Sequence, residues 1–234
     1  EPEFKKLSFA NIELDSLWLL IYTSTIMAIL RFVSGPIVHR FSPLGLLAFS
    51  SLVAAIGLIF LSRAQVLMIL GAATVYGIGK TFFWPTTLGV VAERFPKGGA
   101  LTLNGISAVG MLGVGIVGNV FLGNIQDKSI DANIAAYDQA NGTAIHSTYV
   151  TEEKRGIFGE YNALNKKKLE GASTEDKALI EEIQAGAKKG AMSTVSIFPF
   201  IMMFCYIGLI LYFRSRGGYK PIILEEGEER AVNT

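Results

Sequence analysis

The chain has 234 residues, of which 50% are hydrophobic and only 18% are charged, and its 25 glycines and 15 phenylalanines make it too apolar for an ordinary soluble domain. A net charge of +1, with no basic stripe carrying interleaved aromatic side chains, excludes nucleic acid as a partner. The single cysteine, Cys205, excludes a disulfide within the chain. We therefore expect a membrane protein, and no residue pattern indicates a cofactor.

The chain opens on the charged segment EPEFKK, without a starting methionine or the pattern of a signal peptide. We expect residues 1–15 to form a loop or the frayed end of a helix, and the chain to be a fragment.

Five apolar stretches follow, and each is long enough to cross a bilayer as a helix. They cover residues 16–38, 44–61, 66–92, 100–125 and 191–216. Short polar links between the first four place successive helices antiparallel to one another. The sequence thus predicts an all-α membrane protein, a polytopic helical bundle with five transmembrane helices.

The third stretch, 66–92, carries one charge near its middle, Lys80. A continuous helix of this length would cover roughly 40 Å, which exceeds the hydrocarbon thickness of about 30 Å. An ammonium group at mid-depth is costly unless it faces a protein partner or a water-filled cavity. We therefore expect Lys80 to face a cavity; the alternative is that it snorkels along lipid towards a head group.

The fourth stretch, 100–125, is rich in glycines at small-xxx-small spacing, which lets neighbouring helices approach closely. Its two amides, Asn104 and Asn119, need partners and would serve either helix packing or a substrate.

Residues 125–190 change abruptly to a polar composition, with no run long enough to span. We expect an aqueous insertion. Ser173 followed by Asp176 resembles a capping box, and the apolar positions that follow predict an amphipathic helix over 174–188. Asn141-Gly142 predicts a turn.

The distribution of basic residues predicts the orientation. Because five spans alternate sides, the links at 39–40 and 94–97 and the tail at 217–234 share one side, which carries an excess of Lys and Arg in short segments. We expect an integral protein of the plasma or inner membrane, with the tail in the cytoplasm and the insertion outside.

Several of these segments resemble the C-terminal half of a major facilitator superfamily transporter. The link G-P-I-V-H-R-F-S-P from Gly35 resembles the family's loop motif, although His39 stands where the family has an acid. The segment A-E-R-F-P-K-G-G from Ala92 resembles the Glu-x-Phe-Pro segment that sugar-porter members carry after their tenth helix. The glycine-rich fourth stretch and the fifth, which contains Pro199, match the eleventh and twelfth helices in character.

The resemblance implies that residues 1–124 hold helices eight to eleven of a twelve-helix transporter, that 125–190 is inserted, and that 191–216 is the last helix. Its partners would be the missing six-helix N-terminal half, the seventh helix and the lipid bilayer. Members of this family hold substrate between two bundles near the midplane and alternate access by rocking. The implied function is secondary active transport of a small polar solute, such as a sugar, a nucleoside or an organic anion, with a proton or a sodium ion as the coupling ion of a symporter.

The candidate substrate-binding residues combine a cation, aromatic rings, a hydroxyl and an amide. They are Lys80, Tyr76, Phe83, Trp84, Tyr22 and Asn104. Helical spacing places the first four within one broad face, and aromatic rings beside a helix break can stack on a sugar or base ring. Packing against lipid or other helices explains the aromatic residues equally well. The hydroxyls near Tyr22 belong to Thr23 and Thr25, and such groups commonly bond their own backbone.

A second set of residues is expected to gate transport or to support the structure. It comprises Arg31, Pro85, Gly35, Arg40, Glu93 and Arg94. Pro85 would let its helix bend, and Arg31 would pair with helix-end carbonyls or with Glu93. His39 and His146 fall on opposite sides of the predicted membrane, so no metal site is expected and each is expected to be a solvated loop histidine.

No Asp or Glu lies within the five stretches, so a carboxylate that titrates during proton coupling would have to lie elsewhere. An enzyme is not expected, because the spans offer neither a histidine nor a carboxylate to activate a nucleophile. The alternative function is that of a membrane receptor or scaffold whose working part is the external insertion.

Overall fold

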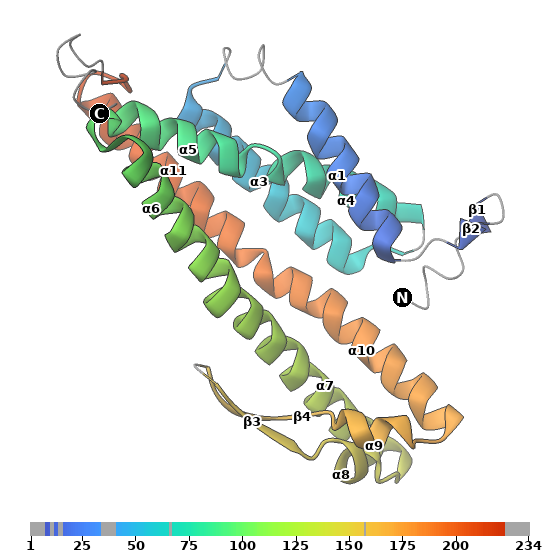
Figure 1. The fold of residues 1–234 in the computed structure, drawn as a ribbon. Helices are drawn as coiled ribbons and strands as arrows, with labels where there is room; N and C mark the ends of the chain where they lie inside the picture. Colours follow the sequence, from blue (N-terminus) through green and yellow to red (C-terminus); the bar gives the residue numbers. More distant parts are fainter. Residues whose placement is uncertain are drawn as a thin grey trace. The chain divides into compact units, whose positions relative to one another are not determined.

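The computed structural model describes residues 8–9, 12–13, 16–33, 41–65, 67–156 and 158–222. They divide into two compact units. The apolar unit consists of residues 8–111 and 196–222, and the insertion unit consists of residues 112–195. Both are mainly helical (Figure 1), in agreement with the helical fold predicted from the sequence.

The elements of the apolar unit are the strands β1 (Ser8–Phe9) and β2 (Ile12–Glu13), helices α1 (Ser16–Phe32), α3 (Pro43–Arg63), α4 (Leu67–Lys80) and α5 (Phe83–Arg94), the 3-10 turn η1 (Pro96–Gly98), and helices α6 (Gly99–Leu112) and α11 (Ile197–Ser215). The insertion unit contains the π-helix η2 (Gly113–Gly118), helices α7 (Asn119–Asn141) and α8 (Ile145–Tyr149), strands β3 (Glu152–Gly156) and β4 (Gly159–Ala163), and helices α9 (Lys166–Glu170) and α10 (Thr174–Val195).

Helix α3 forms the centre of the apolar unit, because α4, α5 and α11 all contact it. Ser42 caps its first turn by accepting a hydrogen bond from the Gly45 N–H at 3.1 Å, and Pro43 supplies a fixed φ angle at the first helical position. The leucines of the first turns, Leu46 and Leu47, are buried. A strong start and a buried apolar surface therefore specify this helix.

Two glycines allow α3 and α4 to cross in close contact. A Cβ atom added to Gly57 on α3 would lie 2.5 Å from the Tyr76 backbone nitrogen on α4. A Cβ atom added to Gly79 on α4 would lie 2.4 Å from the Ala54 nitrogen on α3. Because the residue numbers rise along one helix as they fall along the other, the two helices run antiparallel, as their short link predicts.

Among the described residues, three helical runs are long and apolar enough to cross a membrane. They are Pro43–Arg63, Pro96–Asn141 and Thr174–Ser215. They contain the second and fourth predicted stretches and all of the fifth except its last residue. Helix α1 has 17 described residues, which correspond to about 26 Å, slightly less than the hydrocarbon thickness of about 30 Å. The end of the first predicted stretch, 34–38, lies outside the described residues.

The third predicted stretch, 66–92, is the main difference between sequence and structure. We expected one continuous helix, but the structure divides it into α4 and α5, of 14 and 12 residues, with a turn at Thr81 and Phe82. Each half alone covers only about 20 Å. The reason for the interruption is the position of Pro85, as described below.

The insertion unit has a hydrophobic core of its own. Ile134 on α7 and Ile180 on α10 are fully buried, and Tyr149, the last residue of α8, and Val150 belong to the same cluster. Helix α10 covers the predicted amphipathic helix over 174–188 and continues to Val195. Within this unit α7 and α10 lie side by side (Figure 1), so the first and last helices of the insertion pack on each other.

A turn and a hairpin complete the insertion unit. At the predicted Asn141-Gly142 turn, Gly142 ends α7 with φ of +68°, a conformation that a residue without a Cβ adopts readily. Strands β3 and β4 pair antiparallel, with Lys154 opposite Tyr161. No strand was predicted in this region.

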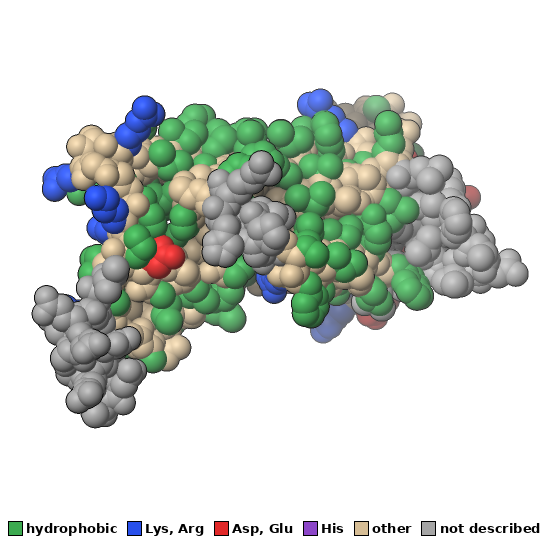
Figure 2. Space-filling model, turned by 90° about the horizontal axis from the view of Figure 1, so that it is seen from above, with side chains coloured by type: hydrophobic (Ala, Val, Ile, Leu, Met, Phe, Trp, Pro, Cys, Tyr) green, Lys and Arg blue, Asp and Glu red, His purple; other side chains and the backbone are tan. Residues whose placement is uncertain are grey.

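Large apolar side chains are exposed on the helices of the apolar unit. Figure 2 shows hydrophobic side chains over much of the face seen there. On α6, Leu101 and Met111 are 83% and 70% exposed, and on α11 Phe204 is 65% exposed. Helices that are apolar on their outer side are the ones expected to contact lipid or further helices rather than water.

Candidate functional site

Pro85 explains why the third stretch is interrupted. Proline has no N–H, so the carbonyl of Thr81, four residues earlier, lacks its usual helical donor, and the proline ring crowds that carbonyl. The Thr81 hydroxyl turns back and donates a hydrogen bond to the Gly77 carbonyl at 2.6 Å. The helix therefore ends immediately before Thr81, and Pro85 lies in the first turn of α5, where a missing N–H is tolerated.

Lys80 is the last residue of α4 and is half-buried. Its Nζ lies 5.1 Å from the centroid of the Tyr76 ring, a cation–π contact within the same helix. The partial negative charge at a helix C-terminus also favours a cation at this position. In the described part of the chain no carboxylate forms an ion pair with Lys80. The ammonium group is therefore held by a ring and a helix end and can interact with an anionic group.

The aromatic residues after Lys80 belong to the second half of the broken helix. Trp84 is 44% exposed, and its ring packs over the α6 backbone at Gly110, where an added Cβ atom would come within 3.1 Å of it. Phe83 is half-buried at the start of α5. We expected these two side chains to share one helical face with Tyr76 and Lys80. The structure corrects this, because the turn places the two pairs on different helices.

Tyr22 connects α1 to α4. Thr74 donates its hydroxyl proton to the Leu70 carbonyl at 2.8 Å, so the Tyr22 hydroxyl is the donor in its 2.7 Å hydrogen bond to Thr74 Oγ1. The neighbouring threonines, Thr23 and Thr25, donate to backbone carbonyls of their own helix. Tyr22 is thus a helix-bridging residue, and these threonines follow the backbone-bonding alternative.

Asn104, the remaining candidate for substrate binding, lies on α6 and is exposed. An exposed amide on an otherwise apolar helix is unfavourable against lipid, so this side of α6 suits a protein partner or water.

The expected gating residues Glu93 and Arg94 end α5, and both bond to the segment that follows α11. The Tyr219 hydroxyl donates to Glu93 Oε2 at 2.6 Å, and Arg94 Nη1 donates to the Lys220 carbonyl at 2.9 Å. Glu93 is therefore engaged with Tyr219, and a pairing of Arg31 with Glu93 stays a prediction. Arg31 lies exposed in the last turn of α1. Two further candidates, Gly35 and Arg40, and also His39, lie outside the described residues.

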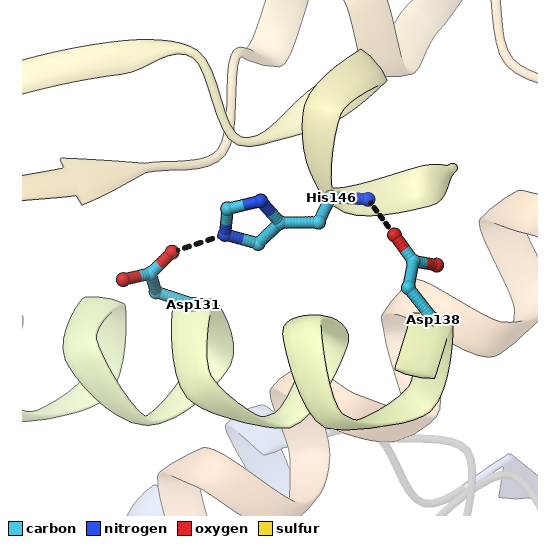
Figure 3. Close-up of polar contacts among 3 residues, drawn as sticks. All are labelled: Asp131, Asp138 and His146. Atoms are coloured by element: carbon cyan, nitrogen blue, oxygen red, sulfur yellow. Dashed lines mark hydrogen bonds and ion pairs between the residues drawn. The ribbon is translucent and has the colours of Figure 1, made fainter. Parts of the chain in front are cut away.

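In the insertion unit, His146 is not a solvated loop residue, contrary to our expectation. It belongs to α8, and its Nε2 lies 2.6 Å from Asp131 Oδ1 on α7 (Figure 3). Because a carboxylate only accepts, the ring nitrogen is the donor. The His146 backbone N–H donates to Asp138 Oδ2 at 2.8 Å, about two helical turns beyond Asp131 on α7 (Figure 3).

Asp138 receives two more hydrogen bonds, from the Ile145 N–H at 3.1 Å and from the Thr143 hydroxyl. Desolvation alone would raise the pKa of Asp138, but these hydrogen bonds and the nearby His146 outweigh it and lower the pKa below 3.8. The carboxylate satisfies N–H groups at the start of α8, which would otherwise have no partner. Asp131 and Asp138 thus fix α8 to α7, which is a structural role.

Comparison with known proteins gives no match: no family description, no curated protein and no solved structure is significantly similar to this chain.

Sequence reasoning missed three features of these sites. The hairpin of β3 and β4 is too polar to show an apolar strand pattern, and Lys154 is instead held there by Asp127 at 3.0 Å. The partner of His146 is fifteen positions away on another helix. Tyr219 falls within the tail that we predicted over 217–234, and no contact with a helix was expected there. Its only signal in the sequence was a tyrosine directly after Gly217-Gly218.

Proposed function

We propose that this chain is part of a secondary transporter that moves a small polar solute across a membrane by alternating access, as the resemblance to the major facilitator superfamily implies. The proposal rests above all on one observation. An apolar helical stretch is interrupted at Thr81–Phe82, and Lys80 lies directly at the interruption.

Irregular backbone at membrane depth is tolerated only where protein covers it or where it lines a water-filled cavity. Transporters commonly bind solutes and ions at such broken helices, near the middle of the bilayer. The half-buried ammonium group of Lys80 has a ring and a helix end as its neighbours and no carboxylate among the described residues. It suits a solute with an anionic group, while Phe83 and Trp84 on α5 suit a solute with a ring.

The experiment is uptake by the full-length protein reconstituted in sealed vesicles, with radiolabelled glucose, uridine and succinate as probes. Lys80→Ala is compared with Lys80→Arg, which keeps the charge, and with Lys188→Ala, which removes an exposed lysine of α10. We expect Lys80→Ala to lower the uptake of the transported probe roughly ten- to hundredfold at equal protein abundance, since a lost charge-assisted hydrogen bond costs about 1.5–3 kcal/mol. Full uptake by Lys80→Ala would remove Lys80 from the solute site, and no uptake of any probe by the wild type would count against the proposal.

The hydrophobic core of the insertion unit favours a second candidate, a membrane receptor or scaffold that works through this unit. The two functions are separated by deleting residues 127–190 and joining the ends with a short Gly/Ser linker. A transporter keeps solute uptake without its insertion, whereas a receptor or scaffold loses its activity and shows no solute flux in either form.

A further inference from the structure

The segment after α11 folds back onto the end of α5. Helix α11 ends at Ser215, and the chain reverses through Gly217 and Gly218, whose φ angles of +90° and +96° are accessible to glycine at little cost. The ends of α11 and α5 lie beside each other in the apolar unit (Figure 1). We call residues 219–222, which follow the two glycines, the strap.

Three hydrogen bonds join the strap to the last residues of α5. The Tyr219 hydroxyl donates to Glu93 Oε2 at 2.6 Å. The Ile222 N–H donates to the Glu93 backbone carbonyl at 2.9 Å, and Arg94 donates to the Lys220 carbonyl at 2.9 Å. Glu93 is thus bound through both its side chain and its backbone, and two of these bonds involve a charged group, which makes them stronger than neutral ones.

Aromatic contacts reinforce the same junction. The Arg94 guanidinium lies 4.7 Å from the centroid of the Phe213 ring on α11. Phe213 in turn packs edge-on against the Tyr219 ring, with centroids 5.4 Å apart. Arg94 therefore contacts α11 and the strap together.

The Tyr219 hydroxyl keeps its proton at physiological pH. Desolvation, with the hydrogen bond to Glu93 and its negative charge, raises the pKa of the Tyr219 hydroxyl well above its ordinary value. The hydroxyl therefore stays protonated and remains a donor.

We propose that the strap holds the C-terminal end of α5 to α11, and that Tyr219, acting through Glu93, is a positioning residue for α5 during transport. This inference rests on the proposed function. Helix α5 begins at the interruption next to Lys80 and ends at the strap. Any swing of α5 about Thr81–Phe82 that moves its far end must stretch or break these contacts, so the strap limits how far and how fast α5 moves.

The strap itself is tested by hydrogen–deuterium exchange on the full-length protein in lipid nanodiscs. Tyr219→Phe removes only the hydroxyl and keeps the ring on Phe213. We expect the Ile222 amide, which donates to the Glu93 carbonyl, to exchange about tenfold faster in this variant. Tyr212→Phe is the matched control, because it removes a hydroxyl from the neighbouring α11 tyrosine outside the strap, and it should leave the exchange unchanged. Equal protection in Tyr219→Phe and the wild type overturns the strap.

The positioning role is tested with the same variants in vesicle uptake of the probe that the wild type transports. We expect Tyr219→Phe and Glu93→Ala each to change the maximal rate severalfold while the KM stays within twofold, and the double variant to match the single ones. Glu93→Gln should retain most of the wild-type rate, because its amide oxygen still accepts from Tyr219. Faster exchange with an unchanged maximal rate overturns the positioning role. No uptake by the wild type overturns both the proposed function and the positioning role of Tyr219. The existence of the strap is then still tested by the hydrogen–deuterium exchange experiment.

Discussion

At the scale of single residues, Asp138 is the side chain on which the junction of α7 and α8 depends most. It accepts hydrogen bonds from Thr143, Ile145 and His146, and these hold its pKa below the ordinary value of 3.8. A carboxyl group whose pKa is lower in the folded state stabilises that state above its unfolded pKa. This contribution is lost as the pH falls below about 3.8 and through the lowered pKa.

Asp138→Ala should therefore loosen α8 at neutral pH, by about 1 kcal/mol as for the loss of a helix cap. The measurement is hydrogen–deuterium exchange of amides 145–149 as the pH is lowered from 7 to about 2. We expect the wild type to lose protection on acidification in this window, and the variant to be poorly protected throughout. Glu160→Gln is the control, because its ion pair with Arg155 is largely exposed and contributes little. A variant that keeps the wild-type profile would contradict the role given to Asp138.

Single residues also show which contacts can be predicted from the sequence and which cannot. Lys80 stands out in the sequence because a charge in an apolar stretch needs an explanation. Its neighbour, the ring of Tyr76, follows from the four-residue spacing. The partners of His146 and Glu93, in contrast, are Asp131 and Tyr219, and nothing local in the sequence links residues that meet only after the helices have packed.

At the scale of the helices, the crossing of α3 and α4 depends on having no side chain at Gly79. An added Cβ atom would lie 2.4 Å from the Ala54 nitrogen and 2.6 Å from its Cα, so backbone and not a flexible side chain would have to move. The same substitution at Gly71, on the same helix, meets nothing within 4 Å.

Gly79→Ala and Gly71→Ala thus form a matched pair. We expect Gly79→Ala to cost roughly 1–3 kcal/mol through overpacking, which corresponds to a fall in Tm of several degrees. Gly71→Ala should be neutral or stabilising by up to about 1 kcal/mol, because alanine is the better helix former. Thermal unfolding in detergent measures both. Equal Tm values for the two variants would show that the helices do not cross at Gly79.

The helices illustrate why the presence of a helix is easier to predict than whether that helix is uninterrupted. Ser42-Pro43 predicts the start of α3, and the apolar run that follows predicts the helix itself. The interruption before Pro85 was visible as a possible bend, but apolar composition from 66 to 92 suggested one helix. Apolar composition indicates that a segment avoids water, but it does not indicate whether the helical hydrogen bonds continue through it. The missing N–H of Pro85 therefore determined the interruption, although the whole stretch is apolar.

At the scale of the whole molecule, Cys205 offers a direct test of where α11 lies. Its side chain is exposed at the surface of the chain, within a helix whose neighbours are apolar. If that surface contacts lipid, a water-soluble reagent cannot reach the thiol.

We expect Cys205 in sealed vesicles to resist a membrane-impermeant maleimide, whereas a cysteine introduced at the exposed Ser147 of the insertion unit is labelled from the external side. After detergent denaturation both should react completely. Rapid labelling of Cys205 before denaturation would mean that α11 is in water, and labelling of Ser147→Cys only from the cytoplasmic side would reverse the predicted orientation.

The way the insertion unit packs has a consequence for the evolution of the chain. Its entering helix α7 and leaving helix α10 pack on each other around Ile134 and Ile180, so the segment between them closes its own core. A unit built in this way can be gained, lost or replaced as a whole during evolution, without compensating substitutions in the helices on either side. It also marks the natural place to graft an epitope or a fluorescent reporter.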